Sequence, residues 1–117
     1  DQFGTPTSSY LIADIIKNHL LKYCIDKKYD SCKEVFNLCS TGYTSWFNLA
    51  KYIIKYASNI NPKYTADIVS INTENYKTIA KRPKYTALSN QKIRTYFDIN
   101  IQNWEYYLEC FLDDFID

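Results

Sequence analysis

Hydrophobic residues recur every three or four positions in several stretches of the chain, which is the spacing of an amphipathic helix. The clearest of these stretches lies near the end of the chain, where apolar and acidic residues occupy opposite faces. Serine and threonine residues precede the other stretches and are suited to cap the first turn of a helix. The predicted helices are Leu11–Tyr23 after Thr7 or Ser8, Trp46–Ala57 after Thr44 or Ser45, a helix capped by Ser89, and Trp104–Phe115.

Two shorter stretches have the pattern of strands. Glu34–Cys39 alternates in polarity and is rich in residues that favour strands, and Ile68–Thr73 has a similar composition. We therefore expect one α/β domain over residues 1–117, with about four helices and two or more short strands. So few strands do not close a sheet, and we expect a strand such as Val35–Leu38 to complete a larger sheet in an upstream domain.

Composition and charge narrow the range of functions. With 46% hydrophobic and 23% charged residues, the chain has the balance of a soluble globular domain. Its formal net charge of +1 provides no field that would attract nucleic acid or an anionic membrane, so neither partner is expected. No apolar stretch reaches the roughly 20 residues of a membrane span. The chain contains no methionine, which indicates a fragment of a longer polypeptide.

The residues that several common chemistries require are missing or misplaced. The two glycines, Gly4 and Gly42, lie 38 positions apart (42 − 4) and cannot form a glycine-rich phosphate loop. His19 is the one histidine and lies on the apolar face of the first helix, where we expect a half-buried core side chain. We therefore assign no catalytic and no metal-binding residue, and no cofactor-binding residue, to this chain.

Pairs spaced as Tyr-x-x-x-Lys are the proton-transfer residues of short-chain dehydrogenases. Two such pairs occur here, Tyr23 with Lys27 and Tyr29 with Lys33. In a chain this rich in tyrosine and lysine such pairs arise by chance, and no cofactor loop precedes them. We reject both pairs as catalytic.

Cysteine spacing bears on the cellular compartment. Four cysteines in a short chain permit a disulfide framework, but none of them forms a C-x-x-C pair. We expect free, reduced thiols in a cytoplasmic protein. The four residues are Cys24, Cys32, Cys39 and Cys110.

Arg82 has the type and position of a binding residue. The chain uses lysine for most of its cations and contains two arginines. Arg82 precedes Pro83 in an irregular segment between a predicted strand and a predicted helix. A guanidinium in such a place suits two-pronged contact with a diphosphate or carboxylate. Composition alone, however, favours an ordinary surface or interdomain salt bridge.

Four motifs in a fixed order carry a resemblance to a known family. They are the D-Q-x-G-x-P-T stretch Asp1–Thr7, the G-x-T-S-W stretch Gly42–Trp46, the Lys81–Pro83 stretch before a capped helix, and Trp104 at the start of the last helix. In this order the motifs resemble the C-terminal half of the dTDP-4-dehydrorhamnose reductase family, a branch of the extended short-chain dehydrogenases. Lys81 departs from the pattern, because the family has arginine there.

The resemblance implies a Rossmann-type parent protein of which this chain is the C-terminal, substrate-binding part. It implies reduction of a 4-keto nucleotide sugar to dTDP-L-rhamnose with NADPH or NADH, for cell-surface polysaccharide. The cofactor is then bound by an N-terminal Rossmann domain that this chain lacks, and the chain alone is expected to be inactive. The nucleotide-sugar pocket is expected to include Gln2, Phe3, Thr5, Thr7 and Arg82.

Two alternatives remain open at this point. One is a non-catalytic partner subunit that resembles the beta subunit of methionine adenosyltransferase. The other is a related epimerase or dehydratase that acts on another nucleotide sugar. A homodimer is compatible with each of these functions.

Overall fold

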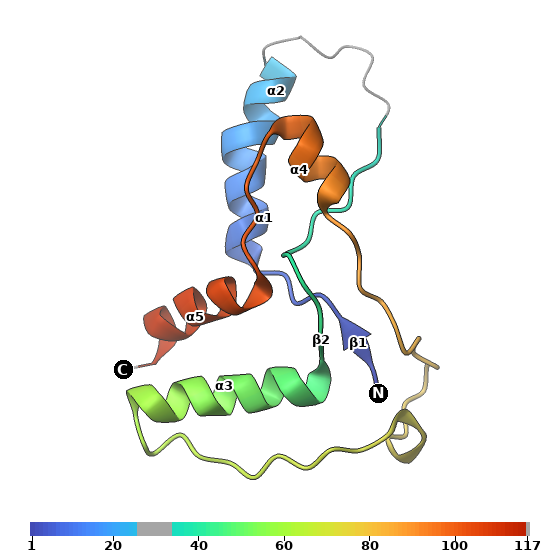
Figure 1. The fold of residues 1–117 in the computed structure, drawn as a ribbon, viewed down its shortest axis with the longest axis vertical. Coiled ribbons are helices and arrows are strands. Elements are labelled where there is room, and N and C mark those ends of the chain that lie inside the picture. The colour runs from blue at the N-terminus through green and yellow to red at the C-terminus, as the bar shows by residue number, and fades with distance from the viewer. Residues whose placement is uncertain (26–33, 117) are drawn as a thin grey trace.

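The computed structural model describes residues 1–25 and 34–116. In this part of the chain, four helical segments are joined by long irregular connections (Figure 1). This number and order of helices confirm the prediction from the sequence. The first segment is a continuous run of α1 (Ser9–Ile15), the π-helical turn η1 (Ile16–Leu20) and α2 (Leu21–Ile25), and the others are α3 (Trp46–Ile60), α4 (Gln91–Phe97) and α5 (Trp104–Phe115). A 3-10 turn, η2 (Thr73–Asn75), interrupts the connection between α3 and α4.

Side-chain caps explain where these helices begin. The hydroxyls of Ser8 and Ser45 each accept a hydrogen bond of 3.1 Å from a backbone N–H in the first turn of α1 and α3, as predicted. The predicted cap of α4 is wrong by one position, because the N-cap is Asn90 and not Ser89. The Asn90 amide does not cap the helix but donates to the Cys39 carbonyl at 2.9 Å, so it ties α4 to a neighbouring segment.

The strands differ from the predicted ones. Glu34–Cys39 and Ile68–Thr73 are not strands; the latter ends at the 3-10 turn. The described strands are instead β1 (Phe3–Gly4) and β2 (Thr44–Ser45), which pair antiparallel with Phe3 opposite Ser45 and Gly4 opposite Thr44. A strand needs a hydrogen-bonding partner, and the described part of the chain supplies none for the two predicted stretches.

The hydrophobic core lies between α1, α4 and the loop that follows α4. Phe36 and Leu38 pack against it, so the segment predicted as a strand contributes apolar side chains without strand pairing. His19 is half-buried, as predicted. The buried core residues are Leu11, Ile15, Ile93, Ile99 and Ile101.

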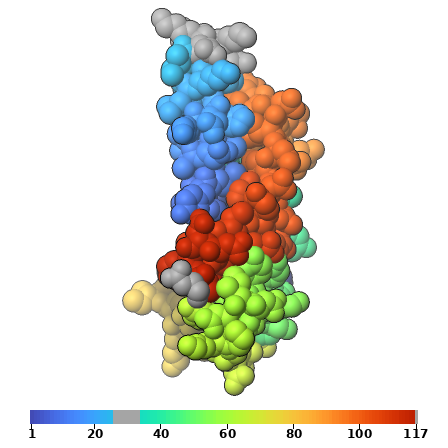
Figure 2. All heavy atoms as spheres, turned by 90° about the vertical axis from the view of Figure 1, so that its left-hand side faces the viewer, coloured from blue at the N-terminus to red at the C-terminus, as the bar shows by residue number. Residues whose placement is uncertain are grey.

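α3 and α5 form a second layer below this core. Seen from the side, α1 lies above α5, and α5 lies above α3 (Figure 2). The Trp104 ring is 6% exposed and meets the Tyr52 ring edge-on, with centroids 5.2 Å apart. This contact joins the start of α5 to the middle of α3.

β1 occupies a central position because it is hydrogen-bonded on both sides. One side pairs with β2, and on the other Phe3 exchanges backbone hydrogen bonds with Lys84 and Thr86, at 2.8 and 2.9 Å. A Cβ at Gly4 would lie 3.1 Å from the Thr86 hydroxyl, so this close approach favours glycine. β1 therefore brings the first residues of the chain against both the start of α3 and the segment that contains Arg82.

Other features bear on the remaining sequence predictions. Cys24, Cys39 and Cys110 are free, while Cys32 lies outside the described residues, as do Lys27, Tyr29 and Lys33 of the rejected pairs. Among residues 1–25 and 34–116, no helix has the length and apolar character needed to cross a membrane. The same residues place no three histidine, cysteine or acidic side chains in an arrangement that could hold a metal ion.

Candidate functional site

A cavity of about 600 Å³ lies between the first turns of α3 and the irregular segment that passes beneath it. Gln2 and Arg82, which are both predicted site residues, line this cavity although they are 80 positions apart (82 − 2). The two residues come close together because β1 holds the start of the chain next to residues 84–86. The volume lies within the usual range of small-molecule sites, roughly 300–1,000 Å³.

Polar contacts fix one wall of this cavity. The Asp1 carboxylate accepts hydrogen bonds from the backbone N–H and the hydroxyl of Thr73, at 2.8 and 2.5 Å, and forms an ion pair with Lys84 at 2.8 Å. The Gln2 amide donates to the Thr73 hydroxyl at 3.2 Å. Thr73 therefore attaches the irregular segment to the chain start, and the acceptors of Asp1 are already occupied.

Arg82 is the positively charged residue of the cavity lining. Its side chain is exposed, and the described residues provide no carboxylate within 4.0 Å and no hydrogen bond to its guanidinium. The Asp1 carboxylate, which is the negative group of the lining, is paired with Lys84. The cavity thus carries an uncompensated positive charge, which suits an anionic ligand group.

Trp46 provides an apolar wall of the main cavity. The sequence pattern puts Trp46 on the inner stripe of its helix, but the side chain is 68% exposed. It follows the N-cap Ser45, and at this first helical position it lies on the rim, where it lines both the main cavity and a smaller one of about 210 Å³. An exposed indole in the same cavity as an unpaired arginine is suited to stacking on a planar or sugar ring.

The other predicted site residues lie outside the main cavity. Thr5 lines the smaller neighbouring cavity and donates to the Gly42 carbonyl at 3.1 Å. Thr7 donates to the carbonyl of Thr5 and accepts from the backbone of Ser40, so its described contacts are structural. Their binding role stays a prediction.

Phe3 is directed to a different part of the molecule. Its ring lies 6.3 Å from that of Tyr43 and 6.4 Å from that of Tyr85, and these two tyrosines line a separate hollow. The family pattern that selected Phe3 could not reveal this, because the tyrosines belong to segments far away in sequence. A role for Phe3 in ligand binding likewise stays a prediction.

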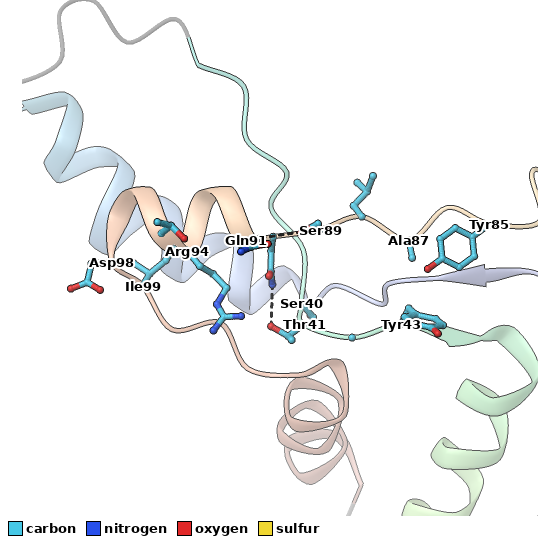
Figure 3. A pocket seen from close by; sticks show the side chains of 14 residues that line it. Ser40, Thr41, Tyr43, Tyr85, Ala87, Ser89, Gln91, Arg94, Asp98 and Ile99 are labelled. Atoms are coloured by element: carbon cyan, nitrogen blue, oxygen red, sulfur yellow. Dashed lines mark hydrogen bonds between the residues drawn. The ribbon is translucent and has the colours of Figure 1, made fainter.

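The separate hollow, of about 880 Å³, lies between the loop that precedes β2 and the start of α4 (Figure 3). Its walls are held by hydrogen bonds, since Thr41 donates to the Ile101 carbonyl at 2.7 Å and accepts from the Asn90 amide at 3.1 Å. The second arginine of the chain, Arg94, also lines it. None of the site residues predicted from the sequence lines this hollow, although Gly42 and Tyr43 of the Gly42–Trp46 motif do.

A cavity with an unpaired arginine and an exposed indole is typical of a ligand-binding domain. Residues 1–116 match the family described as the RmlD substrate binding domain, so the chain belongs to that family. This confirms the resemblance seen in the sequence and the α/β fold class that it implied.

Individual relatives are named as reductases. The chain is 31% identical to a dTDP-4-dehydrorhamnose reductase of Burkholderia thailandensis over 91% of its own length and 37% of the relative's. It is 26% identical to that of Escherichia coli over 90% of its own length and 34% of the relative's. The chain therefore spans about a third of the curated relatives that it matches. Because these relatives are reductases, the partner-subunit alternative is not favoured.

Solved structures agree with this family. A dTDP-4-dehydrorhamnose reductase of Clostridium acetobutylicum matches with a TM-score of 0.75 and 29% identity, over 98% of this chain and 36% of that one. The reductase of Bacillus anthracis in complex with NADP matches with a TM-score of 0.72 and 27% identity, over 97% of this chain and 36% of that one. The chain thus has the fold of one part of these enzymes.

Proposed function

We propose that this chain is the substrate-binding domain of a dTDP-4-dehydrorhamnose reductase, and that the cavity lined by Gln2 and Arg82 binds the nucleotide sugar. The observation that supports the cavity most strongly is that the unpaired Arg82 guanidinium and the exposed Trp46 ring line it together. In this arrangement Arg82 holds the diphosphate by two-pronged hydrogen bonds, Trp46 packs against a ring, and the Gln2 amide contacts a polar group of the ligand.

The nicotinamide cofactor does not fit the described residues of this chain. Phosphates of a dinucleotide are held by glycine-rich loops, whereas Gly4 packs against Thr86 and Gly42 lies beside Trp104. We therefore assign NADPH or NADH, which supplies the hydride, to an N-terminal Rossmann domain in the rest of the parent protein. We likewise assign the proton-transfer residues to that domain, and we expect this chain alone to be inactive.

The parent protein would bind its substrate between the two domains, where ligand sites often lie. The exposed side chains of Trp46, Val69 and Ile71 support such an arrangement, because they leave one side of the cavity apolar and open. Free Cys24, Cys39 and Cys110 support a reducing, cytoplasmic setting. A homodimer of the parent protein belongs to the same proposal.

Calorimetric titration of the full-length protein with a dTDP-sugar tests the binding role of Arg82. Arg82→Ala should weaken binding by about 1.5–3 kcal/mol, the scale of a hydrogen bond to a charged group. Arg82→Lys should recover part of the loss, because a point charge replaces the two-pronged donor. Lys63→Ala, which removes an exposed cation outside the cavity, is the matched control. Equal affinities of all four proteins would leave Arg82 as a surface or interdomain charge.

Activity measurements test the assignment of the enzyme. The full-length protein should oxidise NADPH or NADH in the presence of the 4-keto dTDP-sugar, and this chain alone should not. Oxidation of NADPH or NADH by the isolated chain, in a preparation free of host reductase, would contradict the assignment of the cofactor site and the proton-transfer residues to the N-terminal domain.

A further inference from the structure

Arg94 occupies the polar hollow near α4 without a partner. Its side chain extends from α4 toward the Ser40–Thr41 loop (Figure 3). No described residue accepts a hydrogen bond from its guanidinium, and no described carboxylate lies within 4.0 Å of it. The Nε atom is buried and has no hydrogen-bond partner among the described residues. A buried donor left in this state is costly, and such atoms in native proteins need an explanation.

A second unsatisfied group lines the same hollow. The Ser40 hydroxyl is buried and has no hydrogen-bond partner, and the residue as a whole is 1% exposed. The neighbouring polar groups differ, because the Asn90 amide and the Thr41 hydroxyl are bonded to each other and to backbone carbonyls. Among the described residues, the buried side-chain nitrogen and oxygen atoms without a partner are Ser40 Oγ and Arg94 Nε, and both residues line this hollow.

The charges around Arg94 do not neutralise it. Asp98 also lines the hollow, but Figure 3 shows its carboxylate turned away from the guanidinium, and no ion pair joins the two. Lys92, on the same helix, pairs with Glu34 at 2.5 Å and lies over the Phe36 ring, so it is engaged elsewhere. The hollow therefore presents a guanidinium whose charge no described carboxylate compensates.

We propose that this hollow binds a small molecule through an oxyanion group, a phosphate or a carboxylate, held by Arg94. A planar guanidinium matches the two oxygens of such a group, and the Ser40 hydroxyl can add a donor after a small shift of its rotamer. At the opposite end of the hollow, the exposed rings of Tyr43 and Tyr85 lie 5.8 Å apart and provide a surface for the rest of the ligand (Figure 3).

This site is separate from the proposed nucleotide-sugar site. The two cavities share no lining residue, and each contains one of the two arginines of the chain. A failure of Arg82 to bind a dTDP-sugar would not alter the expectation for Arg94, and the reverse also holds.

The presence of only two arginines allows a direct test by nuclear magnetic resonance. In the ¹⁵N-labelled 117-residue chain with Arg82→Gln, a single arginine Nε–H signal remains, and it belongs to Arg94. Titration with inorganic phosphate should shift this signal along a saturating curve, and sodium chloride at matched ionic strength should not. A linear drift with phosphate that chloride reproduces would overturn the proposal.

Variants at the site provide a second measurement. In calorimetric titrations with inorganic phosphate, Arg94→Gln should weaken binding roughly tenfold or more, since a charged hydrogen-bond donor is lost. Arg94→Lys should lie between Arg94→Gln and the unaltered chain. Unchanged affinity in a folded Arg94→Gln protein would contradict the proposal. If Arg94→Gln does not fold, the phosphate titration of the Arg82→Gln protein still tests the proposal.

Discussion

The Tyr52 hydroxyl of α3 donates a hydrogen bond to the Glu109 carboxylate of α5. One turn further along both helices, Tyr56 donates to Asp113 at 2.8 Å. The two helices run in the same direction, so residues four positions apart on each can meet in register (Figure 1). These contacts attach α3, which carries Trp46, to the rest of the domain.

Removal of one of these hydroxyls should destabilise the domain modestly. We expect Tyr52→Phe to lower the free energy of unfolding by about 0.5–1.5 kcal/mol, because the ring still packs against Trp104 while its hydrogen bond is lost. Urea denaturation measures this change. Tyr10→Phe is the matched control, since Tyr10 is 62% exposed, and it should have no effect. Equal losses in both variants would show that the Tyr52 hydrogen bond adds nothing.

The same contacts predict a loss of stability at alkaline pH. The hydrogen bond to Glu109, with a smaller contribution from burial, raises the pKa of Tyr52 to about 12, and burial raises the pKa of Tyr107. The folded state holds these two protons more tightly than the unfolded state does. Their contribution to the free energy of unfolding is therefore complete below a pH of about 10, the pKa of a free tyrosine. It should disappear as the pH rises from about 10 to about 12. Urea denaturation at several pH values measures this loss, and the free energy of unfolding should fall less steeply with pH in Tyr52→Phe than in the unaltered protein.

The helices could be predicted from the sequence because their signals are local. Ser8 and Ser45 cap the helices that they were predicted to cap, and Leu11 and Ile15 of the first apolar stripe lie in the core. The strands could not be predicted, because pairing depends on a partner far away in sequence. β1 is a two-residue strand, too short to produce a pattern, and residues 34–39 lack a partner in the described part of the chain.

The site could be predicted in part. Motif order selected Gln2 and Arg82, and β1 brings them to one cavity. Thr73 and the exposed face of Trp46 were missed, because neither the contact with Asp1 nor the rim position follows from periodicity. Arg94 lies in a helix whose sequence resembles any amphipathic helix, and its missing partner is visible only in three dimensions.

Thr73 should control the order of the segment below α3. Thr73→Val removes the hydroxyl that donates to Asp1 and accepts from Gln2, although the backbone hydrogen bond to Asp1 remains. We expect faster hydrogen exchange at the backbone amides of residues 73–76 and weaker binding of a dTDP-sugar in the full-length protein. Thr65→Val is the control, because no described contact involves the Thr65 hydroxyl. Unchanged exchange in Thr73→Val would mean that other contacts order this segment.

The free cysteines should differ in reactivity. Burial raises the pKa of the Cys39 thiol, and the residue is 4% exposed, whereas Cys24 and Cys110 are exposed. The thiolate is the reactive form, so a brief treatment with iodoacetamide should modify Cys24 and Cys110 well before Cys39. Mass spectrometry of peptides at timed intervals measures these rates. If Cys39 reacts as fast as the exposed pair, the segment that carries it opens readily.

Gly42, the first residue of the Gly42–Trp46 motif, has a backbone conformation that favours glycine. It adopts a φ of +85°, in a conformation that residues with a Cβ rarely take. Its carbonyl accepts a hydrogen bond from Thr5, and the residue lines the hollow that also contains Arg94.

Gly42→Ala should therefore destabilise the domain through its backbone. An added Cβ would lie 3.5 Å from Trp104, an ordinary contact, so the expected loss of about 1–2 kcal/mol comes from the left-handed conformation. Gly42→Asn should lose less, although its side chain is larger, because asparagine tolerates this conformation better than alanine does. Thermal and urea denaturation of the three proteins measure this order. If Gly42→Asn were the less stable variant, steric contact with Trp104 and not backbone conformation would be the reason for glycine at this position.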